Sequence, residues 1–122
     1  LALAALMAKG LQYNTSALHR SYASSQAYDI ADRIRANHLG AAEGRYNSIL
    51  GSASNPDCIS DGCTPAQMAQ FDHWEWSATN AAVLPAGSGE VVLNNPNYRI
   101  TLTWDDDRDG KADDSFEFEF RP

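Results

Sequence analysis

The first 38 residues constrain this chain most, because they read as one uninterrupted α-helix. They contain no proline and a single glycine, Gly10, and they are rich in the helix formers Ala, Leu, Gln, Arg and Met. A helix of that length extends about 55 Å at 1.5 Å per residue. A compact domain of 122 residues has a radius of gyration of only about 13–14 Å. We therefore expect the first half of the helix to project from its domain or to pack on other chains.

A stripe of apolar residues predicts which side of this helix faces the core. Its members recur at intervals that return to one face of a helix: Leu11, Leu18, Tyr22, Ala23, Ala27, Ile30 and Ile34. We expect the part from Ala23 to Ile34 to lie in the core. The stretch Asn37–Gly40 is a predicted helix stop, because Gly40 can adopt the left-handed conformation that ends many helices.

The middle of the chain divides into a loop and a second helix. Residues 40–63 are rich in Gly, Ser, Asn and Asp, which predicts a long ordered loop. Thr64 and Pro65 form the start signal of a second helix over residues 64–83. The predicted apolar side of this helix consists of Met68, Phe71, Ala78 and Ala82, flanked by Trp74 or Trp76.

The last part of the chain, residues 89–122, has the two-residue period of β-strands. Residues 98–104 and 116–120 alternate apolar and polar side chains, and a Val-rich run precedes them at 90–94. Strands this close in sequence favour an antiparallel sheet of three to four strands with one apolar face. Because the long helix also needs a partner for its apolar side, we predict a single α+β domain over residues 1–122.

Charge and cysteine content narrow the function. The formal net charge of −7 argues against nucleic acid as a partner, because binding phosphates needs a basic patch. Cys58 and Cys63 are the only cysteines, which leaves a structural zinc site two ligands short. A disulfide across the turn at Asp61–Gly62 is the interpretation we favour, and it implies a periplasmic or extracellular protein. A pair of free thiols in the cytosol is the alternative.

No catalytic constellation is present in the sequence. His19, His38 and His73 are far apart, and we expect each to be a surface residue on or beside a helix. There is no nucleophile elbow and no glycine-rich phosphate loop, since Gly87–Gly89 precedes a predicted strand and not a helix. An active site needs a nucleophile, a base and an orienting group within reach of one another, so we do not expect an enzyme.

The acidic segment 105–114 is the one candidate site for a ligand. Asp105, Asp107 and Asp109, followed by Gly110, occupy positions one, three and five of a loop that resembles the first half of an EF-hand. Six aspartates within ten residues repel one another unless a counter-ion is present. Ca²⁺ is therefore the candidate cofactor.

The remaining calcium ligands are less regular. Lys111 would contribute its backbone carbonyl at position seven, and Asp113 would close the site directly or through water. Position twelve is Phe116 where an EF-hand has a bidentate Glu, and the flanking segments are predicted strands. The alternative is an acidic hairpin turn at Asp109–Gly110 that binds no ion.

The order of elements resembles the type IV pilin fold, in which a long N-terminal helix precedes a small antiparallel sheet. Residues 27–37 resemble a characteristic segment of the PilV group of minor pilins. Residues 65–69 with Asp72, and the strand end at 101–105, are also similar to that group. The resemblance implies a minor pilin that primes filament assembly and forms part of a tip complex supporting adhesin display. A pseudopilin of a type II secretion system and a free calcium-binding periplasmic or adhesive module are the alternatives.

The resemblance also implies partners and a location. We expect other minor pilins and the major pilin to bind the first half of the helix, with Leu6, Leu11 and Leu18 at the interface. A tip adhesin is a further expected partner. Residues 1–8 read as the end of a longer apolar helix, which would anchor the protein in the inner membrane before assembly. The domain would then be periplasmic, and later part of an extracellular pilus.

Overall fold

A computed structural model describes residues 2–122, so Leu1, where the predicted helix begins, lies outside the described residues. The helices are α1 (Ala2–Ala36), α2 (His38–Ala42), α3 (Cys58–Asp61) and α4 (Pro65–Val83). The strands are β1 (Ser48–Ile49), β2 (Ser88–Asn94), β3 (Asn97–Trp104) and β4 (Asp114–Phe120). The predicted α+β class is confirmed, with a long N-terminal helix and an antiparallel sheet.

The four strands form one antiparallel sheet in the order β1-β2-β3-β4. Ile100 on β3 pairs with Val91 on one side and with Phe118 on the other. β1 pairs with β2 through only two residues, and it lies in the segment that the sequence predicted as a loop. β4 is the opposite edge strand, and along it Glu117 and Glu119 alternate with phenylalanines.

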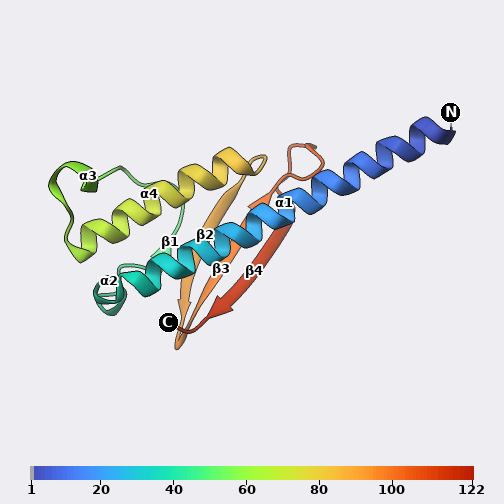
Figure 1. Cartoon of the computed structure of the whole chain (residues 1–122). Coiled ribbons are helices and arrows are strands. Elements are labelled where there is room, and N and C mark those ends of the chain that lie inside the picture. Colours follow the sequence, from blue (N-terminus) through green and yellow to red (C-terminus); the bar gives the residue numbers. More distant parts are fainter. Residues whose placement is uncertain (1) are drawn as a thin grey trace.

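α1 lies across one face of the sheet and then continues well beyond it (Figure 1). α4 lies beside α1 and over β2, so the two helices together cover the inner face of the sheet. The loop between β3 and β4 reaches α1 where that helix leaves the domain, whereas the C-terminus lies at the opposite end, near α2. The molecule is therefore a compact head with a protruding helical half.

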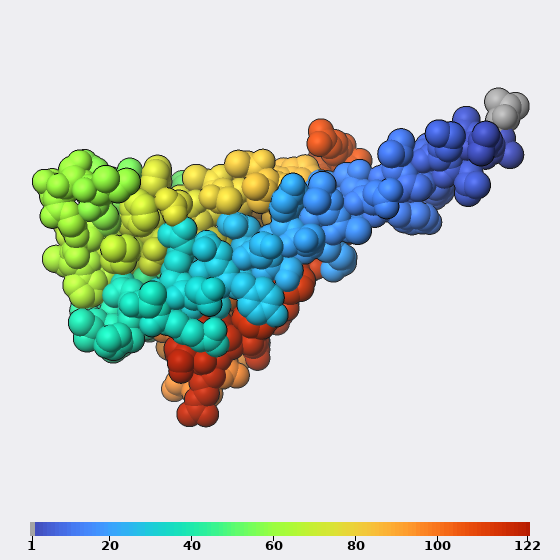
Figure 2. All heavy atoms as spheres, in the orientation of Figure 1, coloured from blue at the N-terminus to red at the C-terminus, as the bar shows by residue number. Residues whose placement is uncertain are grey.

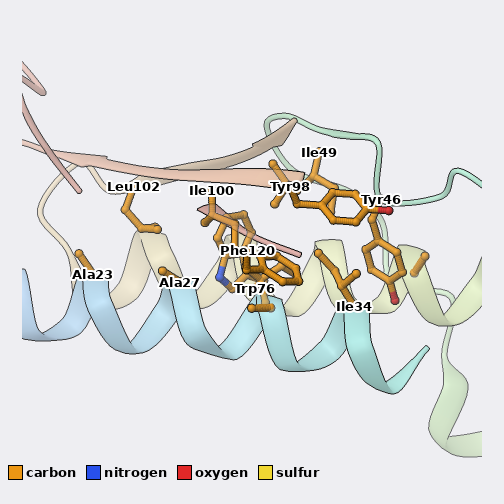
Figure 3. Packing of buried hydrophobic residues seen from close by; sticks show 14 of the residues in the cluster. Ala23, Ala27, Ile34, Tyr46, Ile49, Trp76, Tyr98, Ile100, Leu102 and Phe120 are labelled. Carbon is orange, nitrogen blue, oxygen red and sulfur yellow. The ribbon is translucent and has the colours of Figure 1, made fainter. Parts of the chain in front are cut away.

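The core forms where the second half of α1 meets the sheet and α4 (Figure 3). Ala23 and Ala27 are fully buried, and their small side chains let the helix approach Leu102 and Ile100 closely. Trp76 of α4 fills the space between the layers, and its indole N–H donates to the Gln26 carbonyl at 2.8 Å. This helix–sheet contact is the one that the strand and helix periods predicted.

The predicted stripe on α1 is wrong in its upstream part. Leu11, Leu18 and Tyr22 are exposed, whereas His19 continues the buried side below Ala23. Leu18 and Tyr22 are four residues apart, as are His19 and Ala23. Because each lies one position earlier in the sequence, Leu18 and Tyr22 face a direction about 100° away from that of His19 and Ala23. The apolar side of the helix thus changes direction where α1 leaves the domain.

The long helix ends next to the predicted stop, but Gly40 does not have the predicted role. α1 ends at Ala36, and Gly40 lies inside α2 with its N–H bound by the side chain of Asn37. A Cβ added at Gly40 would lie 2.5 Å from the Asn37 amide and 3.0 Å from the Pro65 carbonyl oxygen. Glycine is needed at this position for close packing, not for a left-handed cap.

The predicted apolar side of α4 is wrong at Ala78 and Ala82, whereas Met68 and Phe71 are half-buried and the predicted flanking Trp76 is buried. The buried residues of this helix are Ala69, Asp72, Trp76 and Asn80, two of which are polar, whereas Ala78 and Ala82 are exposed. The predicted start is confirmed, because Thr64 caps the helix and exchanges hydrogen bonds with Gln67. The hydrophobic pattern failed here because the buried polar residues have partners on other elements.

A polar network explains the buried aspartate of α4. Nη1 of Arg33 donates to Oδ1 of Asp72 at 3.0 Å, and the Tyr46 hydroxyl donates to Oδ2 at 2.5 Å. Nδ2 of Asn37 donates in turn to the Tyr46 hydroxyl and to the carbonyl of Pro65. These hydrogen bonds satisfy the buried carboxylate of Asp72, which is why it can lie inside. They also connect α1 and α4 to the segment that leads to β1.

Candidate functional site

The protruding half of α1 is the first candidate site. It stands clear of the rest of the molecule (Figure 2). All side chains from Ala2 to Thr15 are exposed, among them several large apolar ones: Leu3, Leu6, Met7, Leu11 and Tyr13. Lys9 is the only charged residue between positions 2 and 18. Within residues 2–122, no helix is both long and apolar enough to cross a membrane.

The three predicted interface residues do not share one side of this helix. Leu11 is 68% exposed and Leu18 is 49% exposed, and their spacing of seven residues places them about 20° apart around the axis. Leu6 is also exposed but lies about 120–140° away from both. The structure therefore brings Leu11 and Leu18 to one side and leaves Leu6 on another.

Asp106 ties the acidic loop to α1 at the point where the helix leaves the domain. Its Oδ1 lies 2.6 Å from Nδ1 of His19, and its Oδ2 accepts from the Ser16 hydroxyl at 2.5 Å. The indole N–H of Trp104 donates to Oδ1 at 3.2 Å. Burial raises the pKa of Asp106, but the donors on Ser16, His19 and Trp104 outweigh this and hold the pKa below its ordinary value.

We call the contacts of Asp106 with Ser16 and His19 the Asp106 clamp. The sequence did not predict it. His19, expected at the surface, is only 7% exposed, and Asp106 is not among the predicted calcium ligands. The one available signal was the position of His19 four residues before Ala23, which continues the buried side of α1.

The acidic loop, the second candidate site, brings three of its predicted ligands together. Carboxylate oxygens of Asp105, Asp107 and Asp109 all lie within 4.8 Å of one another. The backbone N–H groups of Asp109 and Gly110 donate to the two oxygens of Asp105, at 3.1 and 2.8 Å. The Lys111 N–H donates to Oδ1 of Asp109 at 2.8 Å. The loop is thus folded around its first aspartate.

The two remaining predicted ligands, Lys111 and Asp113, are placed differently. Both are exposed, and Asp113 is not part of the convergent group of three. The Asp113 N–H donates to the Lys111 carbonyl at 3.0 Å, which leaves that oxygen one lone pair for an ion. A complete ligand set would require this end of the loop to rearrange.

Electrostatics differ between the first two aspartates of the group. Burial raises the pKa of Asp105, which is 6% exposed, but hydrogen bonds from the Gly110 and Asp109 N–H groups outweigh this effect. The pKa of Asp105 is therefore below its ordinary value. For Asp107, desolvation and the neighbouring carboxylates of Asp109 and Asp113 raise the pKa. The surroundings therefore favour the negative charge of Asp105 and oppose that of Asp107.

The predicted disulfide joins Cys58 and Cys63 across α3. Their Cα atoms lie 5.0 Å apart, within the range that a disulfide bridges. Gly62 takes the positive φ of 70° that the turn requires. The bond closes the segment that leads directly into the cap of α4.

Comparison of the sequence with models of known protein families gives one match. The model of the Tt1218-like family, described as type IV pilin Tt1218, matches residues 5–74, which is more than half of the chain. The chain belongs to the Tt1218-like type IV pilins. No curated protein and no solved structure matches it.

Membership of the family gives the protein a structural role. Type IV pilins are structural proteins, not an enzyme family, and this pilin assembles with other pilins in a pilus. The match begins at Ala5 and so includes most of the protruding half of α1. The part of α1 that its own domain leaves uncovered is therefore part of what defines the family.

Proposed function

We propose that this pilin is a minor pilin that enters a type IV pilus through the protruding half of α1. The observation that carries the proposal is the run of exposed large apolar residues on a helix that its own domain does not cover, including Leu3, Met7 and Leu11. Burying each such side chain in a filament stabilises the assembly by roughly 1.5–3 kcal/mol.

The proposed role within the filament is to prime assembly and to form part of a tip complex that supports an adhesin. The resemblance of residues 27–37 to the PilV group supports it. In this proposal a segment before Leu1 anchors the protein in the inner membrane until it is assembled, and the partners are the major pilin and other minor pilins. A pseudopilin of a type II secretion system has the same architecture and is the competing assignment.

The test replaces apolar residues of the protruding helix by charges in a strain that makes pili. Leu11→Asp with Leu18→Asp should reduce incorporation into sheared pili at least about tenfold, because a charge buried without a partner is costly. The melting temperature of the head should stay unchanged, since both residues are exposed in the single chain.

The control for this test is Ile59→Asp on α3. Ile59 is an exposed apolar residue, 90% exposed, on the part of the head distant from the protruding helix. Its replacement should leave incorporation at the parental level. Normal pili from the Leu11/Leu18 variant would rule out assembly through this helix.

Counting subunits separates the two assignments. A minor pilin should be present in sheared pili at far fewer copies than the major pilin, and its deletion should reduce the number of pili. Intact pili in the deletion strain, together with a defect in protein secretion, would favour the pseudopilin.

A second proposal is that the acidic loop binds Ca²⁺. The convergence of oxygens from Asp105, Asp107 and Asp109 within 4.8 Å supports it, because Ca²⁺ takes carboxylate oxygens from a flexible loop. The ion would offset repulsion among these aspartates and stabilise the connection between β3 and β4.

A further inference from the structure

We propose that the head has a binding pocket for the last residue of an extended polypeptide, with an apolar side chain inside and the terminal carboxylate at Arg35, His38 and Tyr98. The pocket has a volume of about 430 Å³, which is within the range of small-ligand sites. It lies at the end of the head opposite the protruding helix, where α1 ends and α2 begins. Its lining includes Ile34, Arg35, His38, Ala41, Tyr98 and Pro122.

Arg35 brings an oriented guanidinium group to this pocket. Its Cζ lies 4.8 Å from the centre of the Phe120 ring, so the planar group is held over the aromatic face. Within residues 2–122 it donates no hydrogen bond, and its one ion pair, with the exposed Asp32, is 4.0 Å long. Arg33, by contrast, is bound to three carboxylates. Arg35 therefore keeps its N–H groups for a ligand, in the planar geometry that suits a carboxylate.

The Tyr98 hydroxyl is a second donor without a partner. Tyr98 is only 4% exposed, and its ring stacks on Phe120 with the ring centres 5.6 Å apart. The Tyr46 hydroxyl donates to Asp72, whereas that of Tyr98 has no hydrogen-bond partner in the described chain. Burial raises the pKa of Tyr98, so the hydroxyl keeps its proton at neutral pH. Because Tyr98 lines the pocket, a ligand there can accept this hydrogen bond.

The charge around the pocket also favours an anion. The chain has a formal net charge of −7, yet none of the described residues that line the pocket is Asp or Glu. His38 is exposed and lies three positions after Arg35, so both side chains can reach the same anion. The pocket is thus a basic place on an otherwise acidic protein.

The rest of the lining determines the body of the ligand. Ile34 is fully buried, Ala41 is half-buried, and Pro122 adds a further apolar side chain. Only Ile34 and Tyr98 are buried among the lining residues, so the pocket is shallow and suits one or two residues better than a long acyl chain. A carboxylate beside an apolar side chain is the end of a polypeptide whose last residue is apolar.

The test is a titration of the whole 122-residue chain with a synthetic peptide, followed by NMR through the backbone amide signals of the lining residues. The peptide is acetyl-Gly-Ser-Gly-Val-Leu with a free carboxylate, and its matched control has a carboxyl-terminal amide. We expect the acid to bind with a dissociation constant of roughly 1 mM or below. The amide should bind at least about tenfold more weakly, because hydrogen bonds to a charged acceptor are the stronger ones.

Three variants assign the binding to the named groups. Tyr98→Phe removes a hydroxyl that has no partner in the described chain, so the affinity should fall about threefold or more while the melting temperature stays unchanged. Arg35→Gln should abolish the difference between acid and amide. Arg45→Gln changes another exposed arginine of the head, paired with Glu43, and should bind like the parent.

The proposal goes beyond the proposed function, and its test is independent of filament assembly. Equal binding of acid and amide, or parental binding by Arg35→Gln, would overturn the carboxylate site. Absence of any shift at millimolar peptide would overturn it too. Decanoate that shifts these signals where the peptide does not would assign the pocket to a free fatty acid and overturn the polypeptide end. None of these outcomes affects assembly through α1, because the pocket lies at the other end of the head.

Discussion

Nδ1 of His19 lies 2.6 Å from Oδ1 of Asp106, which links the first buried side chain of α1 to the loop between β3 and β4. This contact therefore joins the loop with the candidate cation site to the helix with the exposed apolar residues. A helix held at this contact extends about 21 Å further from Ser16 to Ala2. A tilt of about 10° at the contact would move its far end by about 4 Å, half of a typical helix–helix distance.

Asp106→Ala should loosen the protruding helix without unfolding the head. Spin labels at Gln12 and Glu117, both exposed, report the angle between helix and sheet through their distance distribution. We expect this distribution to broaden in Asp106→Ala and, less strongly, in Ser16→Ala, because each change removes a helix contact. Asp113→Ala removes one charge from the same loop and should leave the distribution unchanged. An equally narrow distribution in all three variants would exclude the clamp.

Ile30→Asp should destabilise the head strongly. Ile30 is fully buried among the core residues of α1, and an aspartate there would be an unpaired charge in an apolar environment, at a cost of about 3 kcal/mol. The measurement is thermal or urea unfolding. Ser25→Asp, at an exposed position on the same helix, is the control and should change stability by less than about 0.5 kcal/mol. Similar unfolding of the two variants would contradict the packing of α1 on the sheet.

Tyr46→Phe should lower stability at neutral pH by about 1–2 kcal/mol, because it removes a buried hydroxyl that binds Asp72 and Asn37. Burial and the hydrogen bond to Asp72 raise the pKa of Tyr46 above its ordinary value of 10.0. A group whose pKa is raised by folding contributes its stability below the unfolded pKa and loses it as the pH rises. The advantage of the parent over the variant should therefore shrink above about pH 10.

The control for that prediction is Tyr13→Phe on the protruding helix, where the ring is exposed. Its stability should equal that of the parent at every pH. An advantage of the parent over Tyr46→Phe that stays constant from pH 8 to about pH 12 would contradict the linkage.

Reduction of the disulfide should cost about 2 kcal/mol of stability, since Cys58 and Cys63 are only five positions apart in sequence and short loops give small entropic gains. Intact mass with an alkylating reagent, before and after reduction, reports the bond in periplasmically expressed protein. The double variant Cys58→Ser/Cys63→Ser should melt at the temperature of the reduced parent. Two alkylated thiols in the unreduced protein would show that the bond does not form.

Calcium should bind the acidic loop weakly, with a dissociation constant of roughly 10⁻⁴ to 10⁻³ M, because Phe116 replaces the bidentate glutamate of an EF-hand. Calorimetric titration and melting in calcium or chelator should give a signal that Asp107→Asn with Asp109→Asn abolishes. Asp57→Asn with Asp61→Asn removes the same charge elsewhere on the surface and should bind like the parent. Identical melting temperatures in calcium and chelator, without heat of binding, would leave only an acidic turn.

Periodicity predicted the parts of this fold that obey one period. The strands β3 and β4 and the second half of α1 lie where their alternation placed them, because each buries one plain apolar side. The pairs Leu18–Tyr22 and His19–Ala23 are both four residues apart, but at 3.6 residues per turn only the second pair continues the buried side of α1. The sequence could not show why a polar side chain ends that side, because the partner of His19 is Asp106, which is remote in sequence.

The buried side of α4 could not be predicted from hydrophobicity, because two of its residues are polar. Asp72 and Asn80 lie inside because Arg33 and Gln26 of α1 bind them, and a hydrophobicity pattern carries no record of such partners. β1 has two residues, too few to show a period. The protruding half of α1 was predictable for the opposite reason, since its length alone exceeded what the head could cover.

The charges on edge strand β4 oppose the pairing of this strand with a strand of another subunit. β4 has a neighbour on one side only, and its exposed Glu117 and Glu119 both form ion pairs with Arg99 of β3. A second sheet that approached this edge would bring like charges together, which opposes strand addition. In the proposed assembly, heads crowded together along a pilus would therefore not join edge to edge, and the contacts that hold the filament together would come from the helix.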